Sequence, residues 1–161
     1  MSSKVKVLYI TGWGRSGSTL LDRILGQIEG FESFGELRYI WDRNFLDDRL
    51  CGCGNPFSQC PEWTQIISKA FGSMDGIDPV EMINYRDQNT RTRHLMSLML
   101  PGAREKILSK VQPYLDNLDS LYNAIRDHFN TRVIVDSSKF PSYAFSLDLT
   151  RTIDLLSLIH I

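Results

Sequence analysis

A glycine- and serine-rich turn between two apolar segments constrains the fold of this chain more than any other feature. Residues 4–11 (KVKVLYIT) are rich in β-branched and apolar side chains, which is typical of a strand buried on both faces. The turn follows at residues 12–19 (GWGRSGST), and residues 18–27 then place leucine and isoleucine with helical spacing. Strand, turn and helix in this order predict the first unit of an α/β fold.

The turn has the chemistry of an anion-binding loop. Its glycines allow several backbone N–H groups to point to one side, and the following helix adds the positive end of its dipole. Arg15 supplies a guanidinium that can hold an oxyanion through two parallel hydrogen bonds. The residues expected to bind a phosphate or sulfate group are Gly14, Arg15, Ser16, Gly17, Ser18 and Thr19.

One position separates this turn from the phosphate loop of nucleoside triphosphatases. That loop ends in Gly-Lys followed by Ser or Thr, and its lysine reaches the transferred phosphate. Here Ser18 occupies the position of the lysine. The sequence therefore argues against ordinary hydrolysis of ATP or GTP.

The rest of the chain alternates helical and strand patterns. Helices are expected at residues 62–71, 78–100, 103–129 and 142–151, and strands at 131–136 and 153–161. Asp78-Pro79 is a capping residue followed by proline at the first helical position. Pro101-Gly102 is expected to stop that helix, and Pro113 predicts either a kink or two consecutive helices. Strands separated by helices predict parallel pairing in an α/β sandwich.

These elements suit a single domain over residues 1–161. Its parts are a strand, loop and helix in 1–30, a mostly helical cap over one end of the sheet in 40–130, and a strand, helix and strand in 131–161. In open α/β sheets, ligands bind beyond the carboxyl ends of the strands. Because the sequence stops at the end of an apolar strand, we expect a domain that is incomplete at its C-terminus.

Composition excludes some classes of partner. The 161 residues include 18 Lys+Arg and 19 Asp+Glu, a net charge of -1, so no excess charge indicates a nucleic acid or a membrane surface. No apolar run reaches the roughly 18 residues of a transmembrane helix, and the first apolar run is too short for a secretory signal. Three cysteines, an odd number, favour a reducing compartment such as the cytoplasm. Nothing in the sequence indicates the oligomeric state.

Those cysteines, Cys51, Cys53 and Cys60, have C-x-C-x6-C spacing. A tetrahedral zinc site needs one more ligand, and none lies close in the sequence. The expectation is therefore no metal, with the residues either forming a disulfide or remaining three plain thiols.

At the glycine-rich turn, the sequence resembles the sulfotransferases that use 3′-phosphoadenosine 5′-phosphosulfate. Their 5′-phosphosulfate loop reads Arg or Lys, Ser, Gly, Ser or Thr, Thr, and here the matching segment is TGWGRSGSTLLDRIL, residues 11–25. Three further segments resemble bacterial and carbohydrate-type members of the family. They are FGELRYIW (34–41), CGCGNPFSQCPEW (51–63) and VIVDSSKFP (133–141), in order across nearly the whole chain.

The resemblance implies a P-loop NTPase-like three-layer sandwich with a parallel sheet and a helical cap. It implies transfer of a sulfuryl group to a hydroxyl or amine of a small-molecule, carbohydrate or lipid acceptor, without a metal. Arg15 would stabilise charge on the bridging oxygen of the donor. Family members clamp the 3′-phosphate with an Arg-Asp-Pro-Arg type segment after the third strand, and this sequence ends at Ile161. Activity of these residues alone therefore stays open.

Glu36 is the candidate base, because a carboxylate held in a cleft can take the proton of a hydroxyl and a Gly-Glu segment supplies the proposed base in some carbohydrate-type relatives. The alternatives are a structural carboxylate paired with Arg38, and a histidine base such as His94.

Lys139 follows a predicted strand, where it can assist catalysis, and Ser137 and Ser138 can contact the donor. The alternative is a turn that Asp136 caps. Asp136 also resembles a magnesium-binding aspartate, which leaves a P-loop phosphotransferase open. A non-catalytic domain that binds an anion or a partner is the third alternative.

Overall fold

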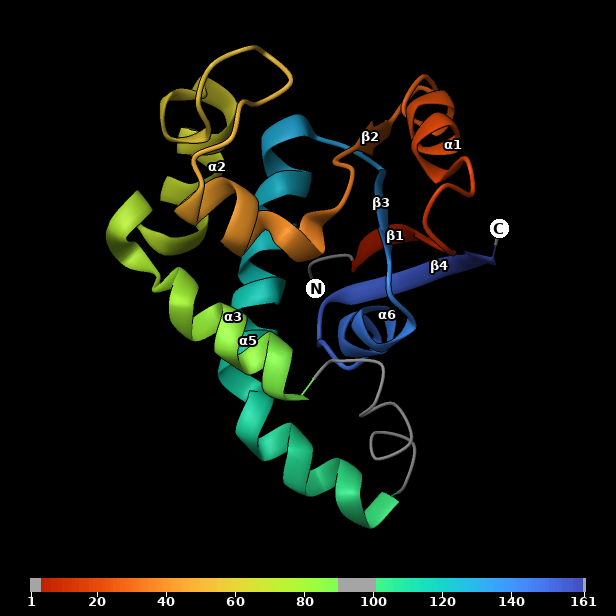
Figure 1. Ribbon diagram of the computed structural model, residues 1–161, viewed down its shortest axis with the longest axis vertical. Coiled ribbons are helices and arrows are strands. Elements are labelled where there is room, and N and C mark those ends of the chain that lie inside the picture. The colour runs from red at the N-terminus through yellow and green to blue at the C-terminus, as the bar shows by residue number, and fades with distance from the viewer. Residues whose placement is uncertain (1–3, 90–100, 161) are drawn as a thin grey trace.

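The computed structural model describes residues 4–89 and 101–160 (Figure 1). Its four strands pair in parallel, in the order β2-β3-β1-β4. They are β1 (Val5–Thr11), β2 (Phe31–Ser33), β3 (Val133–Lys139) and β4 (Ile153–His160). The predicted α/β class with parallel pairing is confirmed. The sequence did not reveal β2, which has only three residues, too few for a recognisable strand pattern.

Helices occupy most of the remaining described chain. They are α1 (Ser18–Leu25), α2 (Pro61–Phe71), α3 (Pro79–Asn89), α5 (Pro101–Phe129) and α6 (Pro141–Asp148), with short helical turns at Leu37–Tyr39, Ile40–Leu46, Phe57–Gln59 and Met74–Gly76. The predicted continuation of α3 to residue 100 lies outside the described residues. No helix in the described ranges combines the length and apolar character needed to cross a membrane.

The structure bears on two prolines that the sequence singled out. Pro113 lies inside α5, which runs as one helix, so of the two predicted alternatives the one with two consecutive helices is wrong. Buried Val111, Tyr114 and Leu115 flank the proline, and their packing favours the continuous helix despite the missing N–H. Pro101 opens α5, and proline is well tolerated in the first helical turn, because the N–H that it lacks would have no acceptor there. The predicted end of the preceding helix lies outside the described residues.

The connections between strands place a crevice at the centre of the sheet. The chain passes from β1 through α1 to β2 in one direction along the sheet, and from β3 through α6 to β4 in the other. Right-handed crossovers in opposite directions put their helices on opposite faces, and Figure 1 shows α1 and α6 on opposite sides of β1 and β4. The carboxyl ends of β1 and β3 therefore flank a topological switch point.

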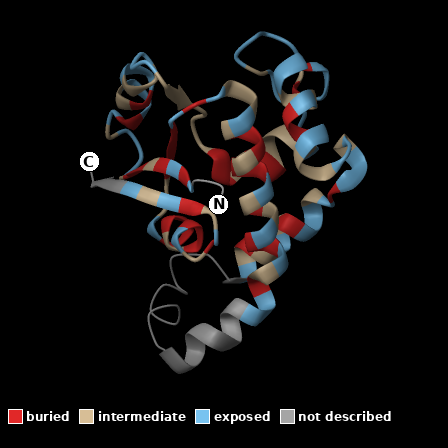
Figure 2. Cartoon of the chain, turned by 180° about the vertical axis from the view of Figure 1, so that it is seen from behind, coloured by how far each residue is buried: buried red, intermediate tan, exposed pale blue. Residues whose placement is uncertain are grey.

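The core lies where α5 packs between the sheet and the other helices. Leu118, Leu121 and Ile125 of α5 are buried, and α5 contacts β1, α2 and α3. Trp41, fully buried, stacks near Phe45 and Phe71 in the helical part of the chain. Figure 2 shows the buried residues gathered in the middle of the molecule and the exposed ones on the outer faces of the helices. One continuous core thus joins the sheet to the helical residues.

Candidate functional site

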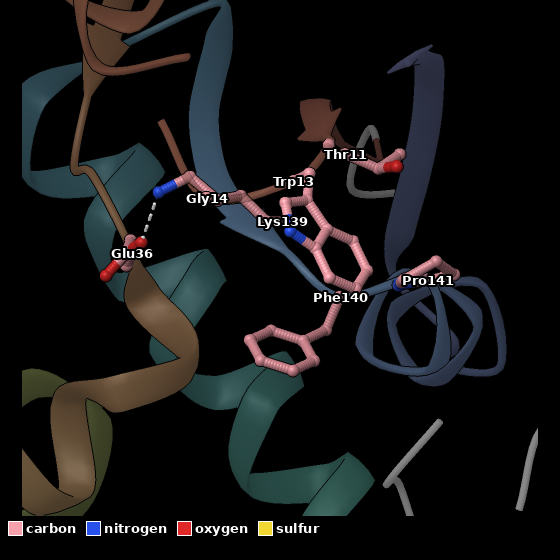
Figure 3. A pocket seen from close by; sticks show the side chains of 8 residues that line it. Thr11, Trp13, Gly14, Glu36, Lys139, Phe140 and Pro141 are labelled. Atoms are coloured by element: carbon pink, nitrogen blue, oxygen red, sulfur yellow. Dashed lines mark hydrogen bonds and ion pairs between the residues drawn. The ribbon is translucent and has the colours of Figure 1, made fainter. Parts of the chain in front are cut away.

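A cavity of about 600 Å³ opens at the switch point (Figure 3). That volume lies within the range of small-molecule sites. Its lining comes from the end of β1, the end of β3 and the segment after β2: Thr11, Gly12, Trp13, Gly14, Glu36, Lys139, Phe140 and Pro141. The walls are largely apolar, with Glu36 and Lys139 as the two charged side chains.

The glycine-rich turn leaves the cavity and enters α1. Arg15 and Gly17 have left-handed backbones, with φ of 66° and 78°, and the carbonyl of Gly17 accepts the N–H groups of Leu20 and Leu21 at 2.9 and 3.1 Å. A Cβ added to Gly14 or Gly17 would meet no atom within 4 Å. Space therefore stands open over the turn, beside the N-terminus of the helix.

Ser16 has an unsatisfied hydroxyl within this turn. Its Oγ is buried and has no hydrogen-bond partner among the described residues. Leaving a buried hydroxyl unpaired costs about 1–3 kcal/mol. Such an atom, in a turn with open space over its glycines, fits the hydrogen-bonding requirement of a bound oxyanion.

The structure brings together only part of the predicted site in the cavity itself. Gly14, Glu36 and Lys139 line it, whereas the residues from Arg15 to Thr19 continue past it into the first turn of α1. The side chains of Arg15 and Thr19 are exposed, and Ser18 is buried. His94, the alternative base, lies outside the described residues.

Glu36 is held between two cations. Its Oε1 lies 2.6 Å from Nζ of Lys139, and its Oε2 lies 2.5 Å from a guanidinium nitrogen of Arg43. Burial acts to raise the pKa of Glu36, but the hydrogen bonds from Lys139 and Arg43 outweigh it and hold the pKa below its usual value. The carboxylate is therefore ionised at neutral pH, and it is a weak base while both cations remain in contact.

The pairing of Glu36 with Arg38, an alternative raised by the sequence, is wrong. The guanidinium carbon of Arg38 lies 4.2 Å from the centroid of the Phe140 ring and 5.1 Å from that of Tyr39. The helical turns after Glu36 place Arg43 at the carboxylate instead. Neither turn has a clear pattern in the sequence, so this partner could not be predicted.

Lys139 reaches Glu36 from the opposite edge of the crevice (Figure 3). It is the last residue of β3 and has a left-handed backbone with φ of 71°. The pairing of β1 with β3 shifts register between Tyr9 and Thr11, and Thr11 then pairs with Lys139. This irregular strand end directs the ammonium group across the cavity.

Ser137 and Ser138 belong to β3 rather than to a turn after it, which corrects the predicted strand end at Asp136. Ser138 donates its hydroxyl to Asp136 at 2.5 Å and accepts the backbone N–H of Arg38 at 3.0 Å. The backbone N–H of Ser137 donates to the carbonyl of Gly35 at 2.7 Å. These bonds tie the segment that contains Glu36 to β3.

Asp136 is directed into the core. Its side chain is fully buried, and it accepts hydrogen bonds from the hydroxyl of Tyr122 at 2.5 Å and from the backbone N–H of Ser138 at 2.9 Å. Burial raises the pKa of Asp136 to about 6, although the bonds from Ser138 and Tyr122 act against this shift. Asp136 therefore bonds to Ser138 within β3 and to Tyr122 in the core, and does not face the loop as a magnesium ligand would.

Five lining residues were not predicted from the sequence as site residues: Thr11, Gly12, Trp13, Phe140 and Pro141. Trp13 is 86% exposed, an unusual state for an indole. An aromatic residue between two glycines of the turn is a signal that could have identified Trp13. Phe140 and Pro141 line the cavity because β3 pairs with β1, and this pairing could not be read from the sequence.

Comparisons with family models, curated proteins and solved structures find no match to this chain. Function must therefore be argued from the geometry and chemistry of the site.

Proposed function

We propose that this chain is a sulfotransferase domain that moves a sulfuryl group from 3′-phosphoadenosine 5′-phosphosulfate to a hydroxyl or amine acceptor. The observation that carries the proposal is the juxtaposition at the switch point. There the glycine-rich turn, with Arg15 and the unpaired Ser16 hydroxyl, adjoins the cavity that holds the Lys139–Glu36 pair. The P-loop type of α/β fold belongs to the same proposal.

The 5′-phosphosulfate would lie over the turn. The Ser16 hydroxyl and the backbone N–H groups of the first turn of α1 are the donors, because the first N–H groups of a helix have no acceptor within it. The exposed guanidinium of Arg15 can close over the anion. We leave Ser138 out of this set, since its hydroxyl is already bonded to Asp136.

Transfer would proceed by direct displacement at sulfur. The acceptor oxygen forms a bond to sulfur while the bond from sulfur to the bridging oxygen breaks, and adenosine 3′,5′-bisphosphate leaves with that electron pair. Arg15 stabilises the charge that develops on the bridging oxygen. Glu36 takes the proton of the acceptor.

Donor binding would also make Glu36 a better base. An anion at the turn attracts Lys139, and Glu36 then loses one of the two cations that lower its pKa. Its pKa rises when the donor is in place, so proton abstraction is coupled to the presence of the group to be transferred.

The apolar wall favours an acceptor with a carbon skeleton that can contact aromatic rings. Trp13 and Phe140 supply that surface beside Glu36 (Figure 3). A reducing compartment such as the cytoplasm suits the three free cysteines.

Calorimetry with adenosine 3′,5′-bisphosphate, in EDTA, tests the proposal beside a titration with ATP and magnesium. We expect the wild-type chain to bind the bisphosphate without magnesium. Arg15→Ala should weaken binding by about 10- to 100-fold, the value of a charged hydrogen bond. Arg49→Ala is the control, because this arginine pairs with Asp47 on another part of the surface.

Binding of ATP with magnesium, and not of the bisphosphate, would replace the proposal with a phosphotransferase. A folded protein that binds neither nucleotide would contradict donor binding and leave an anion- or partner-binding domain.

A further inference from the structure

The three cysteines do not line the cavity, but their sulfur atoms lie close to one another. The Sγ atom of Cys60 lies 3.3 Å from that of Cys51 and 3.6 Å from that of Cys53. All three sulfurs lie within 4.8 Å of one another, and all three are free thiols.

This arrangement matches three corners of a metal tetrahedron. With a Zn–S bond of about 2.3 Å, tetrahedral geometry separates the sulfurs by about 3.8 Å. A disulfide would place two of the sulfur atoms about 2.05 Å apart and would leave the third cysteine as a free thiol. The observed separations allow all three sulfurs to contact a single ion.

The fold of the segment fixes the first two sulfurs. The N–H of Cys51 donates to the carbonyl of Asn55 at 2.8 Å, and the N–H of Gly54 donates to the carbonyl of Cys51 at 2.9 Å. Gly54 has φ of 87°, which a side chain would disfavour. Cys51 and Cys53 therefore lie on one tight turn.

The third sulfur is fixed by the helix that follows. Cys60 is fully buried and immediately precedes α2, and the neighbouring Phe57 is buried against the rings of Phe45 and Trp63. The site is thus largely formed before any ion arrives, which lowers the entropic cost of binding.

Backbone N–H groups already point at two of the sulfurs. The N–H of Asn55 donates a hydrogen bond to the sulfur of Cys53. The N–H groups of Trp63 and Glu62 donate to the sulfur of Cys60. Such bonds orient ligand atoms around a metal.

We propose that Cys51, Cys53 and Cys60 bind one zinc ion as three thiolates. Among the described residues, no further histidine, cysteine or carboxylate joins the group, so the fourth position would take water or an outside ligand. Binding releases the thiol protons to solvent. This site was not predicted from the sequence, because no fourth ligand lies close to the three cysteines along the chain. The ion would link the turn that contains Cys51 and Cys53 to Cys60 at the start of α2. This structural role does not depend on the proposed activity.

Cobalt substitution tests the site. The protein is purified without an affinity tag, reduced with a phosphine and titrated with Co²⁺ and then Zn²⁺. We expect thiolate-to-cobalt charge-transfer bands that saturate at one ion per chain and disappear when zinc displaces cobalt. Zinc should also raise the midpoint of thermal unfolding.

Cys53→Ser removes an exposed ligand with little effect on packing, and it should abolish the bands. Gln59→Ala, an exposed change in the same segment, should keep them. Failure of the reduced protein to bind either ion would overturn the proposal. So would cobalt bands that survive Cys53→Ser, or a disulfide that persists in the reduced protein.

Discussion

Arg15, in the turn after β1, and Lys139, at the end of β3, both have left-handed backbones. This conformation costs a side chain with a Cβ about 1–2 kcal/mol, and such positions persist where the surroundings fix them, often at functional sites. At Lys139 this conformation coincides with the shifted register between β1 and β3. Both residues are cationic, so the strain is located where an anion is proposed to bind.

Asp136 should make stability depend on pH. Its pKa in the folded protein is about 6, raised by burial from 3.8. The folded state therefore holds the proton more tightly, and this contribution to stability is present below about pH 4 and lost as pH rises through about 6. Relative to Asp136→Asn, the unfolding free energy of the wild type should fall by about 3 kcal/mol between about pH 4 and pH 7.

Urea unfolding of the two proteins, followed by circular dichroism across this range, measures the difference. The asparagine keeps one oxygen acceptor for Tyr122, so both proteins are expected to fold. A difference that is constant, or that grows with pH, would contradict the burial of an ionisable carboxyl at this position.

At the scale of elements, Asp78-Pro79 correctly predicted the start of α3. Asp78 accepts the N–H groups of Val80 and Glu81 at 2.8 and 3.3 Å, as a residue capping α3 should. The prediction of secondary structure failed where tertiary contacts, rather than local sequence, determine whether a strand or helix forms. β2 forms because its three residues pair with β3, and α5 passes through Pro113 because buried side chains flank it. Neither cause is local in the sequence.

Replacing the cap of α3 should have a defined cost. Asp78→Ala leaves the two N–H groups without their acceptor and should lower the unfolding free energy by about 1 kcal/mol. Asp78→Ser restores an acceptor oxygen and should recover most of the loss. Asp75→Ala, which removes the same charge from a nearby exposed residue, should change little in urea unfolding. Equal losses for Asp75→Ala and Asp78→Ala would contradict the capping role.

At the scale of the whole molecule, the strand order assembles the candidate site. The turn after β1 was predictable, because glycines, hydroxyls and Arg15 are consecutive in the sequence. Its proximity to Lys139 follows only from the pairing of β1 with β3, residues far apart in the chain. The contact of Arg43 with Glu36 depends on irregular helical turns. Sequence reasoning thus predicted the glycine-rich turn and, one by one, Glu36 and Lys139, but not their arrangement around one cavity.

The central claim is that a sulfated or phosphorylated nucleotide binds at this switch point. The most direct measurement is an amide ¹H–¹⁵N NMR titration with adenosine 3′,5′-bisphosphate, without magnesium. We expect shifts of the amide signals from residues 12–19 and from Lys139 and Phe140, which belong to the turn and to the end of β3 with the residue after it, and none at the cysteine segment 51–60. Shifts confined to other parts of the chain, or no shifts at saturating nucleotide, would contradict the account.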